Sequence, residues 1–190
     1  MEGIFGIAGT PGTGKKSVAP LVAAELGLKC HGLDDLARSL GVPSTPHGSV
    51  DTDKLRRKLR ALDGPAVIYG HLLPYSLDKE QVSRVAVLRC EPAVLKQRLK
   101  ERGYSMRKIV ENVEAELIGL ESSDAFDAYG PAKTFEVDTT KLAPEESAAK
   151  LTAVLKGSAP GRRLDWIRHY DTGARLRSLL SASESGPGLT

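Results

Sequence analysis

A glycine-rich segment near the start of the chain has the residue types and the spacing that bind a triphosphate. Residues 9–15 read GTPGTGK and lie between an apolar run and a helical pattern, which is where a phosphate-binding loop belongs. Glycines let backbone N–H groups turn toward phosphate oxygens, and the helix start adds about half a positive charge. The ammonium of Lys15 is then expected on the β and γ phosphates. The residues expected to bind ATP here are Gly9, Gly12, Thr13, Gly14, Lys15, Lys16 and Ser17.

The residue after Lys15 departs from this pattern. That position normally carries Ser or Thr, whose hydroxyl holds Mg²⁺, but here it is Lys16, and Ser17 follows one place later. Moving the motif by one residue does not restore it, because glycine would then be needed at Thr10 and Lys15. The sequence therefore predicts a triphosphate site without one of its usual protein ligands for the metal.

Arg38 is the candidate for holding a second phosphate. It follows Asp34 and Asp35 at the start of a short helical pattern. A planar guanidinium can bind a phosphate through two parallel hydrogen bonds, which lysine cannot reproduce. The alternative is an exposed arginine on the surface.

A group of basic residues further along could neutralise charge during phosphoryl transfer. Arg98 and Arg102 are four residues apart and project from one helix face, and Arg107 and Lys108 lie just beyond. The alternative is a solvated basic face. His71 stands at the end of an expected strand, which by itself is typical of a structural histidine.

The elements that position these residues alternate between strand and helix. Apolar runs predict strands at 4–8, 28–31, 66–69, 84–88 and 134–137. Helical spacing predicts helices at 15–26, 33–40, 51–62 and 144–155, and a long helical stretch over 91–120 broken at 102–104. Pro20 should kink the first helix, at a cost of about 3 kcal/mol. The alternation predicts an α/β fold of three layers, with a parallel sheet covered by helices on both faces.

Composition limits the remaining possibilities. With 190 residues, 41% of them hydrophobic and 27% charged, the chain fits one globular domain with a short appendage. It has no apolar run of about 18 residues and no basic leader, so no membrane association and a cytoplasmic location are expected. Cys30 and Cys90 are then expected to be reduced thiols.

The C-terminal end carries most of the net charge of +3. Residues 157–190 contain five arginines against three acidic residues, which weakly indicates an acidic partner such as RNA. Residues 157–161 are expected to be a linker and residues 181–190 to be frayed. Trp166, with Leu164 and Ile167, is expected to dock on the core, and a partner site is the alternative.

Six motifs follow one another in a fixed order along the chain. They are Gly9–Lys15, Asp35-Leu36-Ala37-Arg38, Tyr69-Gly70-His71, Leu99-x-x-Arg102-Gly103-Tyr104, Lys108-Ile109-x-x-Asn112-Val113-x-x-Glu116 and Val137-Asp138-Thr139-Thr140. Over about residues 3–156 this order resembles the sixth adenylate kinase isoenzyme family, and the block from Arg102 to Glu116 is the most family-specific part. Members of that family are small nucleoside monophosphate kinases of archaea and eukaryotes, also linked to maturation of the small ribosomal subunit.

The resemblance implies a P-loop nucleoside monophosphate kinase fold. Its kinase domain would span 1–156, with a monophosphate-binding arm at about 31–62, a short lid at about 103–115, and a basic extension at 157–190. The implied partners are ATP, AMP, a small-subunit ribosomal protein and pre-ribosomal RNA, with a role in rRNA processing. By resemblance Lys15, His71 and Arg102 are catalytic, Arg107 joins the ATP site, Arg38 binds the monophosphate, and Asp138–Thr140 contacts adenine.

The sequence departs from this family at a second metal anchor. Where the family has Asp-x-His, this chain has Tyr69-Gly70-His71, so Lys16 and Tyr69 together replace both protein anchors for Mg²⁺. Three interpretations stay open: drift to a weakly active or purely nucleotide-binding protein, fixed charge supplied by Lys16, or Mg²⁺ held by phosphates and water without protein ligands.

The function predicted from the sequence is transfer of the ATP γ-phosphate to AMP or another monophosphate, together with ATPase activity. The alternative is a nucleotide-gated ribosome assembly factor with weak or no kinase turnover. A third reading is a nucleotide-binding protein with no turnover.

Overall fold

The computed structural model describes residues 3–42, 44–45, 49–62, 64–157, 163–170 and 172–181. Its centre is a parallel sheet with the strand order β2-β3-β1-β4-β5. The strands are β1 (Ile4–Ala8), β2 (Lys29–Gly32), β3 (Ala66–Tyr69), β4 (Val82–Arg89) and β5 (Thr134–Asp138). Tyr69 is level with Ile7 on one side and with Gly32 on the other. The segments that follow β1, β2 and β3 therefore emerge side by side at one edge of the sheet.

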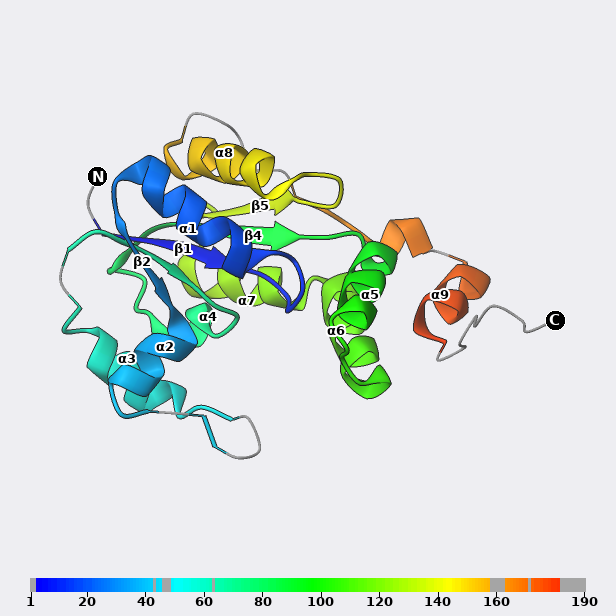
Figure 1. The fold of residues 1–190 in the computed structure, drawn as a ribbon, viewed down its shortest axis with the longest axis horizontal. Coiled ribbons are helices and arrows are strands. Elements are labelled where there is room, and N and C mark those ends of the chain that lie inside the picture. Colours follow the sequence, from blue (N-terminus) through cyan, green and yellow to red (C-terminus); the bar gives the residue numbers. More distant parts are fainter. Residues whose placement is uncertain are drawn as a thin grey trace.

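Helices cover both faces of the sheet, as the alternating pattern predicted (Figure 1). On one face, α1 (Lys15–Leu26) and α8 (Pro144–Leu155) pack on Phe5, Ile7 and the alternate residues of β4. On the other face lie α3 (Thr52–Leu59), α4 (Leu73–Ser76) and α7 (Leu120–Tyr129). All five residues of β1 are buried, because a strand with helices on both sides has no solvent face.

The helix α1 runs without interruption through Pro20, where the sequence predicted a kink in an otherwise continuous helix. Pro20 is solvent-exposed, so the carbonyl group that loses its helical hydrogen bond can be satisfied by water. The short helix α2 (Leu33–Ser39) follows β2 directly.

A helical hairpin stands beyond the end of the sheet at which the phosphate-binding loop lies (Figure 1). It consists of α5 (Pro92–Glu101) and α6 (Met106–Ile118), joined by the predicted break at 102–104. Ser105 begins α6 by accepting a hydrogen bond from the backbone N–H of Lys108. The hairpin holds the basic residues Arg98 and Arg102 next to the sheet.

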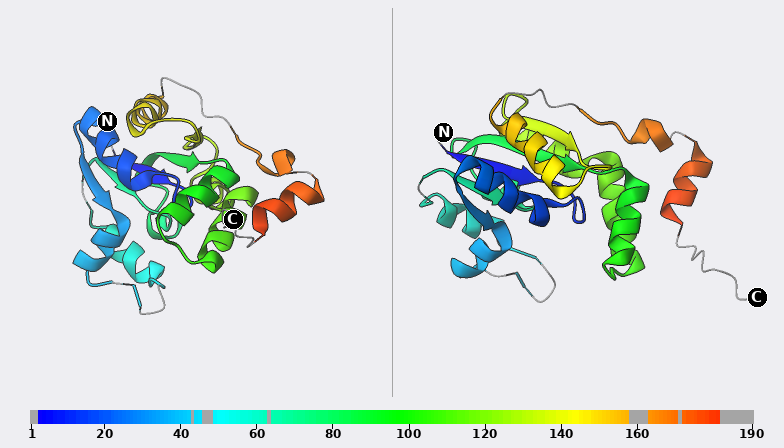
Figure 2. Two further views of the ribbon diagram at one scale, coloured as in Figure 1. Left: turned by 45° about the vertical axis from the view of Figure 1, so that its right-hand side comes forward. Right: turned by 45° about the horizontal axis from the view of Figure 1, so that its top comes forward.

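The described part of the C-terminal segment, residues 163–170 and 172–181, packs against this hairpin (Figure 2). It contains a 3₁₀ turn, η1 (Ile167–Tyr170), and α9 (Gly173–Leu180). Trp166 and Leu179 are buried in one cluster with Leu95 and Leu99 of α5, which confirms that Trp166 docks on the core. Most of the expected linker, residues 158–161, and of the expected frayed end, residues 182–190, lie outside the described residues.

Four helical segments, namely α4, α7, η1 and α9, were not predicted. Their apolar residues follow no clear helical spacing over enough turns to be recognised from sequence. Within the described ranges no helix combines the length and the apolar character needed to span a bilayer.

Candidate nucleotide site

The phosphate-binding loop connects β1 to α1 and packs tightly against β4 and α5. Gly9 has a φ of +134°, and a Cβ there would collide with the carbonyl oxygen of Leu88 on β4. Gly12 has a φ of +96°, and a Cβ there would come within 2.7 Å of Leu95 Cδ1 on α5. Both positions therefore require glycine. The hydroxyl of Thr13 is used inside the loop, where it donates to the carbonyl oxygen of Thr10 at 2.8 Å.

Lys15 folds back over this loop. Its Nζ donates to the carbonyl oxygen of Gly9 and, at 3.1 Å, to that of Thr10. Burial lowers the pKa of the ammonium, while the carboxylates of Glu121 and Glu116 oppose this effect. Backbone carbonyls and nearby carboxylates thus hold the Lys15 ammonium at the loop. Phosphate oxygens can replace these carbonyls as its hydrogen-bond acceptors.

A pocket of about 390 Å³ brings most of the predicted site residues together. It lies between the phosphate-binding loop, the start of α2, the end of β3 and the end of α5. Its lining includes both the ATP-binding and the acceptor-binding candidates, which come from distant parts of the sequence. These residues are Gly12, Gly14, Lys15, Lys16, Ser17, Arg38, His71 and Arg102.

A smaller cavity of about 150 Å³ adjoins the other side of the loop. It is lined by Gly12–Gly14 and Arg102, and on the far side by Thr139 and Leu142 from the segment after β5. Arg98 does not reach toward the larger pocket. Its Nη2 donates to the carbonyl oxygens of Thr139 and Thr140 at 3.2 and 3.0 Å, so it fixes this segment against α5.

The acceptor side of the larger pocket carries mixed charge. Arg38 forms an ion pair with Asp35, and both side chains are exposed. Asp34 also lines the pocket. A phosphate entering here must compete with Asp35 for the guanidinium of Arg38, although such an exposed pair contributes only about 0–1 kcal/mol.

His71 and Tyr69 lie half-buried at the end of β3. Burial and the neighbouring charge of Lys15 lower the pKa of His71, so its imidazole is neutral at neutral pH. Burial also raises the pKa of Tyr69. A Cβ on Gly32 would lie 3.0 Å from the Tyr69 hydroxyl, so this side chain leans toward the end of β2.

Arg107 is not brought to either cavity. Its side chain is 82% exposed and faces Glu111 on the next turn of α6, with an Nε–Oε1 distance of 3.7 Å. The sequence grouped it with Arg102 because the two residues are close along the chain. The turn before Ser105 instead directs it away from the pocket.

Two positions at which the sequence pattern places ligands for Mg²⁺ carry other groups in this protein. An ammonium stands at position 16 and a phenol at position 69, where a hydroxyl and a carboxylate were expected. Among the described residues, no group of three or more His, Cys, Asp or Glu side chains could hold a metal ion.

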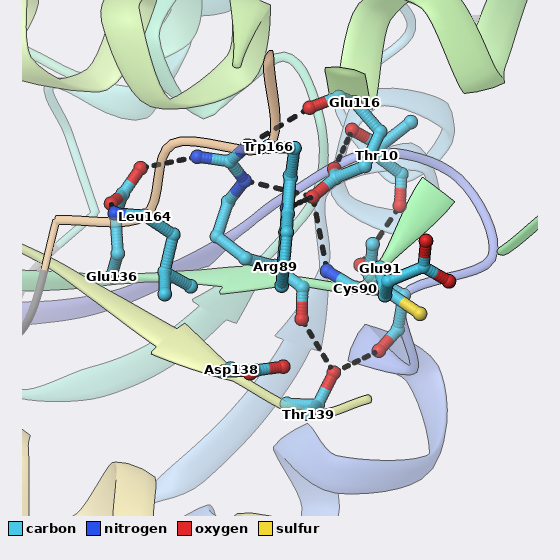
Figure 3. A network of polar contacts seen from close by, with 12 residues as sticks. Thr10, Arg89, Cys90, Glu91, Glu116, Glu136, Asp138, Thr139, Leu164 and Trp166 are labelled. Carbon is cyan, nitrogen blue, oxygen red and sulfur yellow. Dashed lines mark hydrogen bonds and ion pairs between the residues drawn. The ribbon is translucent and has the colours of Figure 1, made fainter. Parts of the chain in front are cut away.

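One feature of the site was missed from the sequence: a buried ionic network behind the loop (Figure 3). It joins Arg89 of β4 to Glu116 and Glu136, with all three side chains at most 2% exposed. Two signals were available, an arginine at the end of an apolar strand and a glutamate inside the most family-specific block.

Comparison with known proteins identifies the family. Residues 6–119 match the family described as "AAA domain". A "Putative adenylate kinase" of Pyrococcus abyssi is 35% identical over 180 residues, covering 88% of this chain and 93% of that protein. One of the same name from Methanothermobacter thermautotrophicus is 36% identical over 157 residues, covering 80% and 89%. The chain belongs to the adenylate-kinase-like family.

Solved structures agree with the fold of this adenylate-kinase-like protein. A shikimate kinase from Acinetobacter baumannii superposes with a TM-score of 0.57 at 14% identity, covering 82% of this chain and 94% of that one. A gluconokinase from Sinorhizobium meliloti 1021 gives 0.53 at 21% identity, covering 83% and 93%. At these identities the likeness concerns the fold alone, and it confirms the predicted three-layer P-loop kinase architecture.

Proposed function

We propose that this adenylate-kinase-like protein transfers the γ-phosphate of ATP to AMP or another nucleoside monophosphate. The observation that supports this most is the single pocket into which Lys15, Arg38, His71 and Arg102 converge. Phosphoryl transfer depends mainly on positioning two phosphates and neutralising their charge. Lys15, Arg38 and Arg102 are suited to both tasks, and the neutral His71 can position a phosphate through a hydrogen bond.

The three cationic side chains have distinct parts in the proposed reaction. Lys15 and the backbone N–H groups of the loop hold the β and γ phosphates, and Arg38 leaves Asp35 to hold the acceptor. An acceptor phosphate oxygen forms a bond to the γ-phosphorus while the bond to the ADP oxygen breaks, giving ADP and a nucleoside diphosphate. Arg102 neutralises charge on the transferring group. The smaller cavity beside Thr139 takes the adenine of ATP.

We also propose a domain arrangement that follows the resemblance. Residues 1–156 form the kinase domain, with the monophosphate-binding arm at about 31–62, the lid at about 103–115 and an extension at 157–190. Mg²⁺ that arrives with ATP is held by phosphates and water, because Lys16 and Tyr69 supply no suitable ligand and Mg²⁺ commonly keeps several waters.

A coupled assay of ATP consumption, with and without each monophosphate, tests this function. AMP should stimulate ADP formation, with two ADP produced per transfer, and Lys15→Ala should abolish it. Lys29→Ala is a matched control, since Lys29 is an exposed lysine at the start of β2 and lies outside both cavities. Stimulation by no monophosphate at all would refute the kinase assignment.

A second candidate is a nucleotide-gated assembly factor for the small ribosomal subunit that hydrolyses ATP slowly. Asp34 and Asp35 on the acceptor side favour this second function, because their carboxylates repel an acceptor phosphate. Tyr69 also favours it, because a phenol stands where a metal-binding carboxylate was expected. Its neutral His71 could accept a hydrogen bond from the attacking water. A small-subunit ribosomal protein and pre-ribosomal RNA are the partners that the resemblance suggests. In the same assay, pre-ribosomal particles rather than monophosphates would then stimulate hydrolysis.

A further inference from the structure

A single carboxylate links the phosphate-binding loop to the C-terminal segment (Figure 3). Glu116 of α6 is 1% exposed, and its carboxylate accepts four hydrogen bonds. Thr10 Oγ1 donates to its Oε2 at 2.6 Å. Its Oε1 accepts from Arg89 Nε at 2.8 Å, from the backbone N–H of Cys90 at 3.0 Å and from Trp166 Nε1 at 3.2 Å.

The carboxylate of Glu116 is held in its orientation by these four donors, because it does not have the charge of Arg89 to itself. Arg89 is shared between Glu116 and Glu136, so one guanidinium serves two buried carboxylates. A buried carboxylate is costly unless it is paired and fully hydrogen-bonded. The C-terminal segment supplies one donor to each: Trp166 Nε1 to Glu116 and the Leu164 backbone N–H to Glu136.

The same contacts continue from Thr10 into the phosphate site. The Thr10 hydroxyl is fixed by Glu116, and its carbonyl oxygen accepts from Lys15 Nζ at 3.1 Å. That carbonyl also accepts from Thr13 Oγ1 at 2.8 Å. Trp166, Glu116, Thr10 and Lys15 thus form a continuous series of hydrogen bonds from the C-terminal segment to the residue expected on the β and γ phosphates.

We propose that the C-terminal segment completes the nucleotide site, with Trp166 acting through Glu116 as a positioning residue for Thr10 and Lys15. This inference rests on the proposed binding of ATP at the loop. Without the indole N–H, Glu116 is free to turn further toward Arg89, and the loop loses the constraint on Thr10.

The simpler alternative is that this segment only covers the apolar side of the helical hairpin. Leu179 does that: it is buried in the same cluster as Leu95 and Leu99, and its side chain has no polar atom that could donate to Glu116. Leu179→Ala therefore serves as the control, because it removes apolar packing and leaves the series of hydrogen bonds in place.

The test compares full-length variants by calorimetric ATP titration and by denaturant unfolding. Trp166→Phe keeps a buried ring but removes the N–H, and Thr10→Val keeps the shape but removes the hydroxyl. Each should weaken ATP binding about fivefold, on the scale of one ordinary hydrogen bond. Because both act through Glu116, the double variant should be little weaker than the worse single variant. Leu179→Ala should lower stability and leave the ATP affinity unchanged.

The chain provides a second readout, because Trp166 is its only tryptophan. ATP should change tryptophan fluorescence with the same saturation curve as calorimetry, and Thr10→Val should abolish that change while it still binds ATP. Unchanged affinity in Trp166→Phe, or multiplicative effects in the double variant, would overturn the inference. If Lys15→Ala does not weaken ATP binding, the proposed phosphate site is refuted. That result would refute the proposed function, and it is distinct from failure of the role proposed for Trp166.

Discussion

Replacing Lys16 should reveal whether its charge substitutes for the metal in ATP binding. Lys16 is exposed, lines the pocket and is the second residue of α1, whose first turn contains no acidic residue. In the free protein its ammonium opposes the helix dipole by about 0.3–1 kcal/mol, a cost that a bound anion removes. A direct exposed ion pair with phosphate adds about 0.2–1 kcal/mol. The charge should therefore favour ATP binding by about 1 kcal/mol, or about fivefold.

The assay is calorimetric titration with ATP in excess chelator and in excess Mg²⁺. The native protein should bind ATP almost equally in both, although turnover still requires Mg²⁺. In chelator, Lys16→Thr should weaken binding about fivefold. Lys29→Thr is the matched control, because Lys29 is an exposed lysine at the start of β2, at the opposite end of the sheet.

Restoring both anchors tests the same reasoning in the other direction. Lys16→Thr combined with Tyr69→Asp should raise turnover and make binding more dependent on Mg²⁺, with each change alone doing less. A loss of more than about tenfold, or 1.4 kcal/mol, when the native protein is moved from Mg²⁺ to chelator would show that Lys16 does not replace the metal.

Four shorter predictions concern the rest of the molecule. Lys15→Ala should weaken ATP binding by at least about 1.5–3 kcal/mol, measured by calorimetry, because a charged hydrogen bond is lost; unchanged affinity would remove the phosphate-site assignment. Arg38→Ala should raise the AMP concentration needed for half-maximal rate and spare basal ATP hydrolysis; loss of ATP binding together with basal hydrolysis would show that Arg38 serves the ATP site or the fold instead. Because burial keeps the pKa of His71 below its ordinary 6.5, only the unfolded chain is protonated just below that pH. The free energy of unfolding should thus fall as pH drops below about 6.5, and fall less in His71→Asn; equal pH dependence in denaturant titrations would contradict this. A chain ending at Lys156 should lose about 3–5 kcal/mol of stability, because the buried contacts of residues 163–170 and 172–181 disappear; an unchanged melting temperature would show that these contacts contribute nothing.

The sequence by itself determined the phosphate-binding loop and the sheet that carries it. The spacing of Gly9, Gly14 and Lys15 and the apolar run before them are local patterns, and local steric and periodic rules decide them. The same holds for β3 at Ala66–Tyr69, α1 at Lys15–Leu26 and α8 at Pro144–Leu155, which the structure places where they were predicted. The departures at positions 16 and 69 were also visible in sequence, because each breaks a fixed spacing.

Tertiary structure alone decided which distant side chains meet. Nothing in the spacing of Arg89, Glu116 and Trp166 shows that they share one buried network, since their contacts span 27 and 50 residues of sequence. Proximity along the chain was also misleading for Arg107, which was grouped with Arg102 but points toward Glu111. The physical reason is that burial of a charge is decided by the whole packed fold: a carboxylate is tolerated inside only where strands, helices and the C-terminal segment together supply its donors.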